Sequence, residues 1–310
     1  MTGHIKGFIA LCRKDDDFPD FLSYHCIIHQ QVLTSKRLNT KSVMDITFKI
    51  VNSIRGQSLQ RRLFKMQLGE KNTDLILHTD VRWLSRSKFL QRFRDLLSEI
   101  KTFLEERGDD YRELQDVVWL CDLAFLTDFT GKLSTLNLEL QGREKTVGDM
   151  IGLISAYQNQ FEMMITDLQQ NNFDHFPNLQ DHKNKYPDFE IETEKFVDEI
   201  GKVIQDFESR FSDLKKIEDI IQYLSFPFRQ DLDRKNIAGK ISMIFSMDNV
   251  SLENEIITLQ SDIFLKARSS EEEFWKYVSR DKYSNIRKCR EMLHSFSSDQ
   301  HICVNLHFHT

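Results

Sequence analysis

The sequence predicts a mainly α-helical protein, in which an array of long antiparallel helices follows a short mixed fragment. Prolines and glycines are scarce, with 4 and 11 in 310 residues, which argues against a turn-rich β protein. Apolar residues recur at intervals of three and four over most of the chain, which is the spacing of one helix face. Hydrophobic residues make up 40% of the chain, including 24 phenylalanines, and this is ample for a core.

The first 40 residues predict the mixed fragment. A short helical patch at Gly7–Leu11 precedes an acidic loop, and the apolar run Tyr24–Ile28 is a candidate strand. One strand alone cannot satisfy the hydrogen bonds of its two edges. We therefore expect residues 1–40 to be poorly anchored or to pair with another chain.

Residues 41–290 predict the helical array, in which glycines at positions 56, 69, 108 and 142 end successive helices. A polar segment with two prolines, residues 171–190, predicts a loop and a hinge near the midpoint. Residues 291–310 lose the helical period and predict a divergent C-terminal tail. Helices are expected at about residues 43–54, 59–68, 80–107, 110–140, 147–168, 193–223, 252–264 and 271–278.

The net charge of −6 conceals a basic block near the N-terminus. Between Lys36 and Arg94 there are 14 Lys or Arg against 4 Asp or Glu, a local charge of +10, so the rest of the chain carries −16. Such an asymmetry indicates a polyanionic partner, such as a nucleic acid. The alternative is that the basic block pairs with acidic helices of its own chain, and charge alone leaves both open.

The basic block contains the stretch LHTDVRWLSRSKFLQRF, which places a tryptophan among arginines just before an apolar helix. Backbone amides at a helix start attract phosphate, and an aromatic ring between cations can stack on an unpaired base. A core position for Trp83 beside Phe89 fits the spacing equally well. The cluster continues to Arg92 and Arg94. The nucleic-acid contacts predicted in the block, which we place at 36–94, are Arg82, Trp83, Arg86, Lys88, Arg61 and Arg62.

Other chemical signatures are weak. Cys26-x-x-His29 has half the spacing of a zinc site, but no second close pair follows, so we predict a structural role for both residues and no metal. The five cysteines are odd in number and scattered, which favours a reducing compartment. No phosphate-binding loop, nucleophile elbow or zinc-protease motif occurs, and no apolar run approaches the roughly 18 residues of a membrane span.

Four stretches, MTGHIKGFIALC, YHCIIHQQVL, LHTDVRWLSRSKFLQRF and FWKYVSRDKYSNIRKCREML, resemble transposase-derived proteins of the hAT superfamily. The similar group includes general transcription factor II-I repeat domain-containing protein 2 and the BED-finger domesticated transposases. The resemblance implies an RNase H-like core interrupted by an all-helical insertion. In that family three acidic residues hold two divalent metals for strand transfer. Cys26 and His29 match its Cys-x-x-His motif. Arg82 and Trp83 match its Arg-Trp motif, whose tryptophan stacks where a base is flipped out.

The sequence departs from the family at every catalytic acid. Both aspartates and the BED finger of the family would lie before Met1. Where the family has Ile-Cys-Glu, this chain reads Ile302-Cys303-Val304. Two-metal chemistry needs several convergent carboxylates, so we expect no enzyme activity.

Two classes of function remain. The first is a catalytically inactive, domesticated hAT transposase fragment in the nucleus, which regulates transcription through protein partners, dimerisation or DNA. The second is a helical protein–protein scaffold, or a truncated gene product, with no nucleic-acid role and a location in the cytoplasm. Neither class implies a cofactor, a metal, a membrane or a small-molecule substrate.

Overall fold

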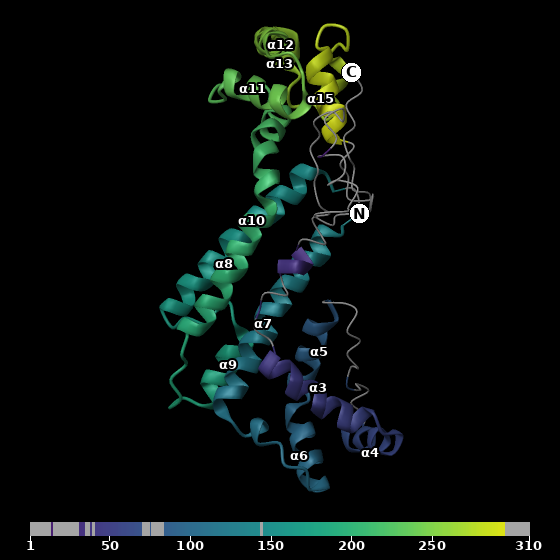
Figure 1. The fold of residues 1–310 in the computed structure, drawn as a ribbon, viewed down its shortest axis with the longest axis vertical. Helices are drawn as coiled ribbons and strands as arrows, with labels where there is room; N and C mark the ends of the chain where they lie inside the picture. Colours follow the sequence, from purple (N-terminus) through teal and green to yellow (C-terminus); the bar gives the residue numbers. More distant parts are fainter. Residues whose placement is uncertain are drawn as a thin grey trace. The chain divides into compact units, whose positions relative to one another are not determined.

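The structure, a computed structural model, describes residues 14, 31–34, 38, 41–69, 75, 84–142 and 145–294 (Figure 1). Helices dominate this part of the chain, which contains no β-strand. The prediction of a mainly α-helical protein is therefore confirmed. The fragment expected at 1–40 and the tail expected at 291–310 lie almost entirely outside the described residues. None of the helices described is both long and apolar enough to cross a membrane.

The chain divides into two compact units, each assembled from separate stretches of sequence. Among the described residues, unit 1 is drawn mainly from 140–154 and 210–294, and unit 2 from 31–139 and 155–209. Helices α8 (Val147–Gln169) and α10 (Glu194–Ser225) contribute residues to both units. The division expected from the sequence, with boundaries near residues 40 and 290, stays a prediction.

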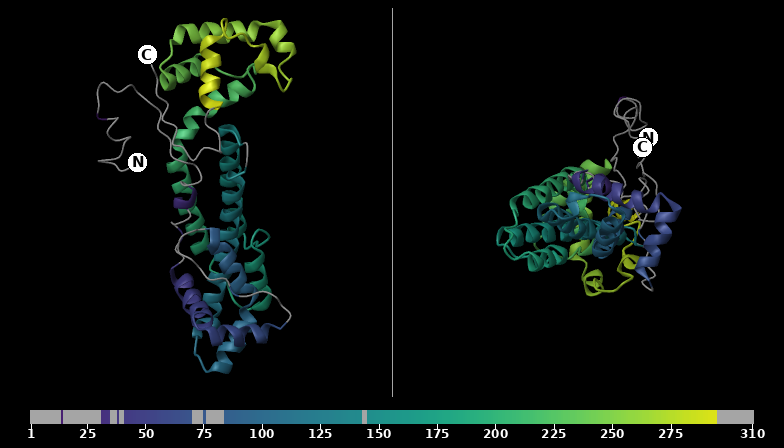
Figure 2. Two further views of the ribbon diagram at one scale, coloured as in Figure 1. Left: turned by 90° about the vertical axis from the view of Figure 1, so that its right-hand side faces the viewer. Right: turned by 90° about the horizontal axis from the view of Figure 1, so that it is seen from below.

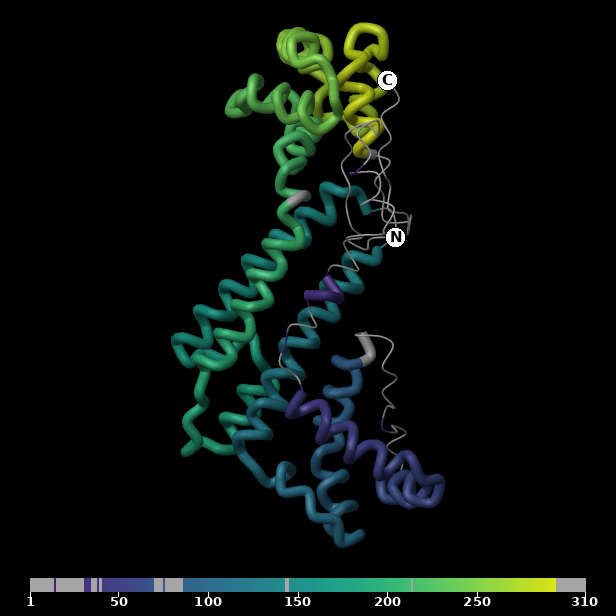
Figure 3. The backbone as a smooth tube through the Cα atoms, in the orientation of Figure 1, coloured from purple at the N-terminus to yellow at the C-terminus, as the bar shows by residue number. Residues whose placement is uncertain are grey.

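Unit 2 contains most of the basic block. Figure 3 shows the chain turning sharply between its first two helices, where the Gly56 amide bonds the Asn52 carbonyl at 2.8 Å. Helix α4 contacts both α3 and α6. The elements that belong to unit 2 are α3 (Lys41–Arg55), α4 (Ser58–Leu68), α5 (Leu84–Asp95), α6 (Leu97–Arg107), the 3₁₀ turn η1 (Arg112–Leu114), nearly all of α7 (Val117–Leu140) and α9 (Pro177–Lys185).

The core of unit 2 is a series of phenylalanine rings between α7, α8 and α10. Phe125 stacks on Phe196 with ring centroids 4.1 Å apart, and Phe129 meets Phe161 at 5.3 Å. Phe161 in turn meets Phe207 at 6.0 Å. All five rings are buried. Because each buried ring contributes about 1.5–3 kcal/mol, this series is a main source of stability in unit 2.

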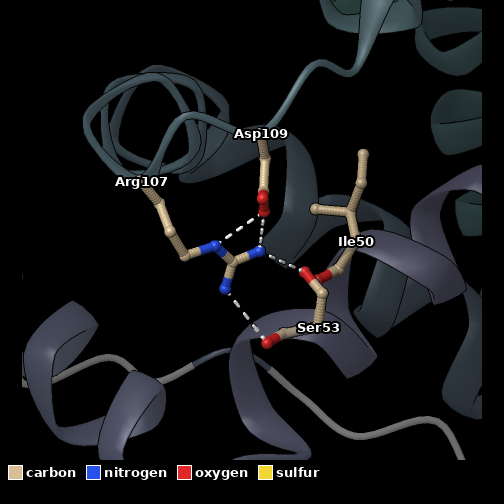
Figure 4. Close-up of polar contacts among 4 residues, drawn as sticks. All are labelled: Ile50, Ser53, Arg107 and Asp109. Atoms are coloured by element: carbon tan, nitrogen blue, oxygen red, sulfur yellow. Dashed lines mark hydrogen bonds and ion pairs between the residues drawn. The ribbon is translucent and has the colours of Figure 1, made fainter.

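A half-buried arginine joins the end of α6 to α3 (Figure 4). The Arg107 guanidinium donates to the Asp109 carboxylate, to the Ser53 carbonyl at 3.2 Å and to the Ser53 hydroxyl at 2.9 Å. The Ser53 hydroxyl donates to the Ile50 carbonyl at 2.9 Å. Gly108 lies between the paired residues with φ +79°, a left-handed conformation that favours glycine, and this ends α6.

Unit 1 gathers the C-terminal half of α10 with a group of shorter helices (Figure 2). The Glu255 carboxylate accepts from the backbone amides of Asn285 and Ile286 at 3.1 and 3.0 Å, so a side chain of α12 caps the start of α15. The Tyr223, Ile241 and Leu252 side chains are buried here. The shorter helices are α11 (Arg234–Phe245), α12 (Asn249–Ser261), α13 (Ile263–Ala267), α14 (Phe274–Tyr277) and α15 (Ser284–His294).

Three expectations about individual helices need correction. The helix expected at 110–140 begins only at Val117, after η1. The helix expected at 80–107 is interrupted at Leu96, whose ψ of 15° separates α5 from α6. The polar loop expected at 171–190 contains α9, because Pro177 occupies the first helical turn, where its missing amide hydrogen costs nothing. The hinge expected there stays a prediction.

Candidate nucleic-acid interface

The structure describes only part of the predicted contact set. Arg82 and Trp83 lie outside the described residues, as do Cys26 and His29. The other four predicted residues lie on two helices of unit 2: Arg61 and Arg62 on α4, and Arg86 and Lys88 on the first half of α5. Lys88 and Arg62 are exposed, whereas Arg61 and Arg86 are half-buried.

A groove of about 440 Å³ lies between α5 and α7, next to the predicted contacts. Lys88 and Arg92 are one helical turn apart and both line it, because residues four apart share one face of a helix. The remaining lining residues are Ser87, Gln91, Asp95, Thr127, Gly131, Ser134 and Thr135.

The guanidinium of Arg92 has few partners for its charge and its hydrogen-bond donors. Its nearest ionic partner is the Asp95 carboxylate, at the long distance of 4.0 Å. Its Nε is buried and has no hydrogen-bond partner. Asp95 also accepts from the Gln91 side chain at 2.8 Å. The buried Nε cannot reach an anion, but the Arg92 side chain as a whole is 30% exposed and its contact with Asp95 is long, so its charge is available to an anion in the groove.

The residues that line the groove on the α7 side are small, and most of them are polar. A Cβ added at Gly131 would meet nothing within 4 Å, so the groove is open at this point. The hydroxyls of Thr127 and Thr135 donate to carbonyls of their own helix, at 2.7 and 3.2 Å. Ser87 and Ser134 supply further hydroxyls of a kind that can donate to phosphate oxygens.

Arg94 lies on another side of α5 and has a structural role. Its Nε donates to the Asn178 side-chain oxygen and its Nη2 to the Asn178 carbonyl, each at 2.6 Å. The Asn178 side-chain amide donates to the Asp128 carboxylate at 2.6 Å. Asp128 also accepts from the backbone amides of Asn178 and Leu179 at 3.2 and 3.1 Å, which caps α9.

Burial changes the pKa of both charged groups in this network. It lowers the pKa of Arg94, and the nearby carboxylate of Asp128 partly opposes this shift. It raises the pKa of Asp128, while the hydrogen bonds from Asn178 and Leu179 oppose the rise. Arg94 is therefore satisfied by Asn178 of its own unit, whereas Lys88 and Arg92 line the groove.

A second cavity, of about 600 Å³, lies on the Arg94 side of α5. Its wall includes His182, which is 3% exposed and packs against Tyr186 and Phe189. Burial, with the added effect of Arg94 and Lys185, lowers the pKa of His182 to about 4. His182 is thus neutral at physiological pH. In the part of the chain that the structure describes, no three His, Cys, Asp or Glu side chains are grouped so as to hold a metal.

The family assignment follows from comparison with known proteins. Residues 25–169 match the family described as the FAM200/GTF2IRD2 helical domain. General transcription factor II-I repeat domain-containing protein 2 from Mus musculus is 32% identical over 99% of this chain, and that from Bos taurus is 31% identical over 99%. This chain carries a FAM200/GTF2IRD2 helical domain. The resemblance to that transposase-derived group is confirmed.

The family match covers the residues of the candidate interface. The FAM200/GTF2IRD2 helical domain includes α4, α5, α7 and every residue of the groove, and it ends at Gln169, the last residue of α8. The chain spans about a third of the length of the curated relatives it matches, since it covers 31% of each. No solved structure matches this chain.

Sequence reasoning found Lys88 but did not select the rest of the groove. Arg92 belongs to the same basic cluster, and its spacing of four from Lys88 is the signal that places both on one helix face. The α7 residues Gly131 and Ser134 had no local signal, because their segment is typical of a packing seam.

Proposed function

We propose that this protein is a non-catalytic nuclear regulator, derived from a hAT transposase, that binds nucleic acid along the groove between α5 and α7. The observation that carries this proposal is the incompletely satisfied Arg92 guanidinium, one turn from the exposed Lys88. Both lie in the basic block, where a polyanion is attracted electrostatically. The similarity to general transcription factor II-I repeat domain-containing protein 2 supports a regulatory role in the nucleus.

The finer parts of the proposal come from the sequence. Residues 41–290 act as the helical insertion of a hAT transposase, and residues 1–40 are a remnant of its RNase H-like core. Catalysis is absent because the chain reads Ile302-Cys303-Val304 where the family has Ile-Cys-Glu, so that carboxylate is missing. Arg82 and Trp83 precede α5 directly and extend the contact surface, with the Trp83 ring stacking on unpaired bases.

The test is binding of fluorescein-labelled duplex and single-stranded DNA to the full chain, measured by anisotropy at several salt concentrations. Counterion release predicts affinity that falls steeply as salt rises. The double variant Lys88→Ala, Arg92→Gln should weaken binding about tenfold and reduce the salt slope by about 1 to 2. Trp83→Ala should weaken single-strand binding more than duplex binding.

The matched control is the double variant Arg61→Ala, Arg62→Ala. It removes the same two charges from the same basic block, but on α4, so it should weaken DNA binding less. An equal loss in both variants would show that binding depends on net charge and not on the groove. Helix content and thermal unfolding of each variant confirm that the fold is retained.

The second candidate is a helical protein–protein scaffold without a nucleic-acid role. The observation that favours it is Arg94, a basic residue of α5 whose hydrogen bonds are all directed to its own chain. Absence of DNA binding at low salt would select this alternative. A Mg²⁺-dependent strand-cleavage assay tests the proposed lack of catalysis, since any cleavage by the purified chain contradicts it.

A further inference from the structure

Helix α4 presents an apolar stripe to solvent. Leu59, Leu63 and Met66 are 58%, 42% and 76% exposed. Their spacing of four and three residues places them on one face of the helix. Large apolar side chains that are exposed together, in contrast to scattered ones, mark interaction surfaces.

The opposite face of α4 holds the helix in place. Phe64 is fully buried and meets the Phe103 ring edge-on, with centroids 5.2 Å apart. Leu68 is 6% exposed, and the Gln67 side chain donates to the Glu99 carbonyl at 3.4 Å. With this face occupied, α4 cannot turn its stripe inward without losing its packing on α6. The stripe is therefore a fixed outward feature of unit 2.

The two edges of the stripe differ in charge. At 100° per residue, Arg62 and Lys65 lie along one edge, and Gln60 and Gln67 lie along the other. Both cations are exposed, and α4 contains no acidic residue. A complementary partner surface therefore combines an apolar ridge with acidic residues on one side.

We propose that the outward face of α4 docks an acidic amphipathic helix of another protein. Three apolar side chains at four- and three-residue spacing match the anchor spacing of a helix laid along α4. Glutamates or aspartates along one edge of that helix pair with Arg62, whose side chain is exposed. This surface lies outside the groove between α5 and α7, and the proposal does not depend on DNA binding.

Charge and shape argue against the other occupants. In an antiparallel pair of α4 helices from two copies, the cationic edges would meet each other, and in a parallel pair each would meet glutamines. Neither arrangement places a carboxylate opposite Arg62. A nucleic acid offers phosphates to these cations but leaves the aliphatic Leu59, Leu63 and Met66 without a matching surface, since its bases stack on aromatic rings.

The test uses the full chain and a fluorescein-labelled synthetic peptide of about 18 residues, or five helical turns. The peptide carries leucines at four- and three-residue spacing and glutamates along one edge, and a control peptide carries lysines instead. We expect the glutamate peptide to bind and the lysine peptide to bind at least about tenfold more weakly. Failure of the glutamate peptide to bind the unmodified chain overturns the proposal, even where DNA binding is intact.

Three variants assign the binding to α4. Leu63→Ser with Met66→Ser should weaken glutamate-peptide binding by about tenfold or more, because truncating apolar anchors removes most of an interface's affinity. Arg62→Glu should weaken it and should strengthen binding of the lysine peptide. Met243→Ser is the matched control, because Met243 is 84% exposed but lies on α11 in unit 1. Undiminished binding by the serine double variant overturns the assignment.

The same serine variant tests the competing occupants. Sedimentation velocity of the unmodified chain and of the serine variant shows whether the stripe mediates self-association. Co-sedimentation of the same two proteins with anionic vesicles shows whether the stripe binds a membrane surface. The proposal expects the variant to change neither result and to leave DNA binding unchanged. Loss of a dimer, of vesicle binding or of DNA binding in this variant identifies a different occupant and overturns the proposal. Circular dichroism controls for folding.

Discussion

The carboxylate of Asp128 on α7 holds the start of α9 through three hydrogen bonds, two from Asn178 and one from Leu179. It accepts from the Asn178 side-chain amide at 2.6 Å, from the Asn178 backbone amide at 3.2 Å and from that of Leu179 at 3.1 Å. Phe176, at the N-cap of α9, makes no capping hydrogen bond of its own. A side chain 50 residues earlier in the chain thus serves as the cap.

Asp128→Ala should lower the free energy of unfolding by about 2–4 kcal/mol. The change removes three hydrogen bonds to a charged acceptor and takes away a neighbouring negative charge from the partly buried Arg94. Urea unfolding measures the loss. The control is Asp233→Ala, which removes a local cap from α11 and should cost about 1 kcal/mol. Equal losses in the two variants would contradict the role given to Asp128.

His182 should make stability depend on pH between about 6.5 and 4. Its pKa in the folded state is about 4, below the unfolded value of 6.5, so the unfolded chain binds the proton first as the pH falls. The contribution is fully present above pH 6.5 and is lost as the pH falls to 4, by up to about 3 kcal/mol. His182→Leu should flatten this part of the stability curve. The difference between the two proteins isolates His182 from nearby carboxylates such as Asp128, whose raised pKa acts in the opposite direction.

Glu255→Ala should destabilise unit 1 by about 2–3 kcal/mol, because it leaves the first amides of α15 without an acceptor. Glu255→Gln keeps an acceptor oxygen but loses the charge, so its effect should be smaller. Thermal unfolding of both variants, with the exposed Glu272→Ala as the control, gives the comparison. A glutamine variant as unstable as the alanine variant would mean that the charge, and not the hydrogen bonding, is decisive.

Replacing Gly108 and replacing Gly152 by alanine should change the free energy of unfolding in opposite directions. Gly108→Ala forces a side chain into the left-handed region at φ +79° and should cost about 1–2 kcal/mol. Gly152 lies within α8, where an added Cβ meets nothing within 4 Å. Gly152→Ala should therefore raise stability by up to about 1 kcal/mol. If the urea concentration at the midpoint of unfolding shifts in the same direction in both variants, the different backbone roles given to Gly108 and Gly152 are contradicted.

The sequence was most informative where a helix carries its own signals. Helix α4 ends at Leu68 before Gly69, with φ 58°, as the glycine predicts. Helix α11 is not among the helices expected, although its signals are local. Asp233 caps it, and Ile237, Ile241 and Phe245 are buried at a spacing of four. Helix α9 could not be predicted in the same way. Its cap is supplied by Asp128, which only the folded chain brings to Asn178.

The candidate site shows the same limit. Lys88 and Arg94 are both cationic and belong to one basic stretch, so no local pattern separates a groove residue from a structural one. Their partners differ because Arg94 faces Asn178, which lies 84 residues away in the chain. Pairing across that distance depends on tertiary packing, and neither helical spacing nor charge pattern encodes it locally.

The way α8 and α10 supply both units constrains how the protein can be dissected. Unit 1 includes the first turns of α8 and the second half of α10, and unit 2 includes the remainder of each helix. No single cut in the backbone releases either unit as one continuous piece. Truncation within α8 or α10 exposes side chains that are buried in the intact chain, so surfaces on this protein are better assigned by point substitution in the intact polypeptide.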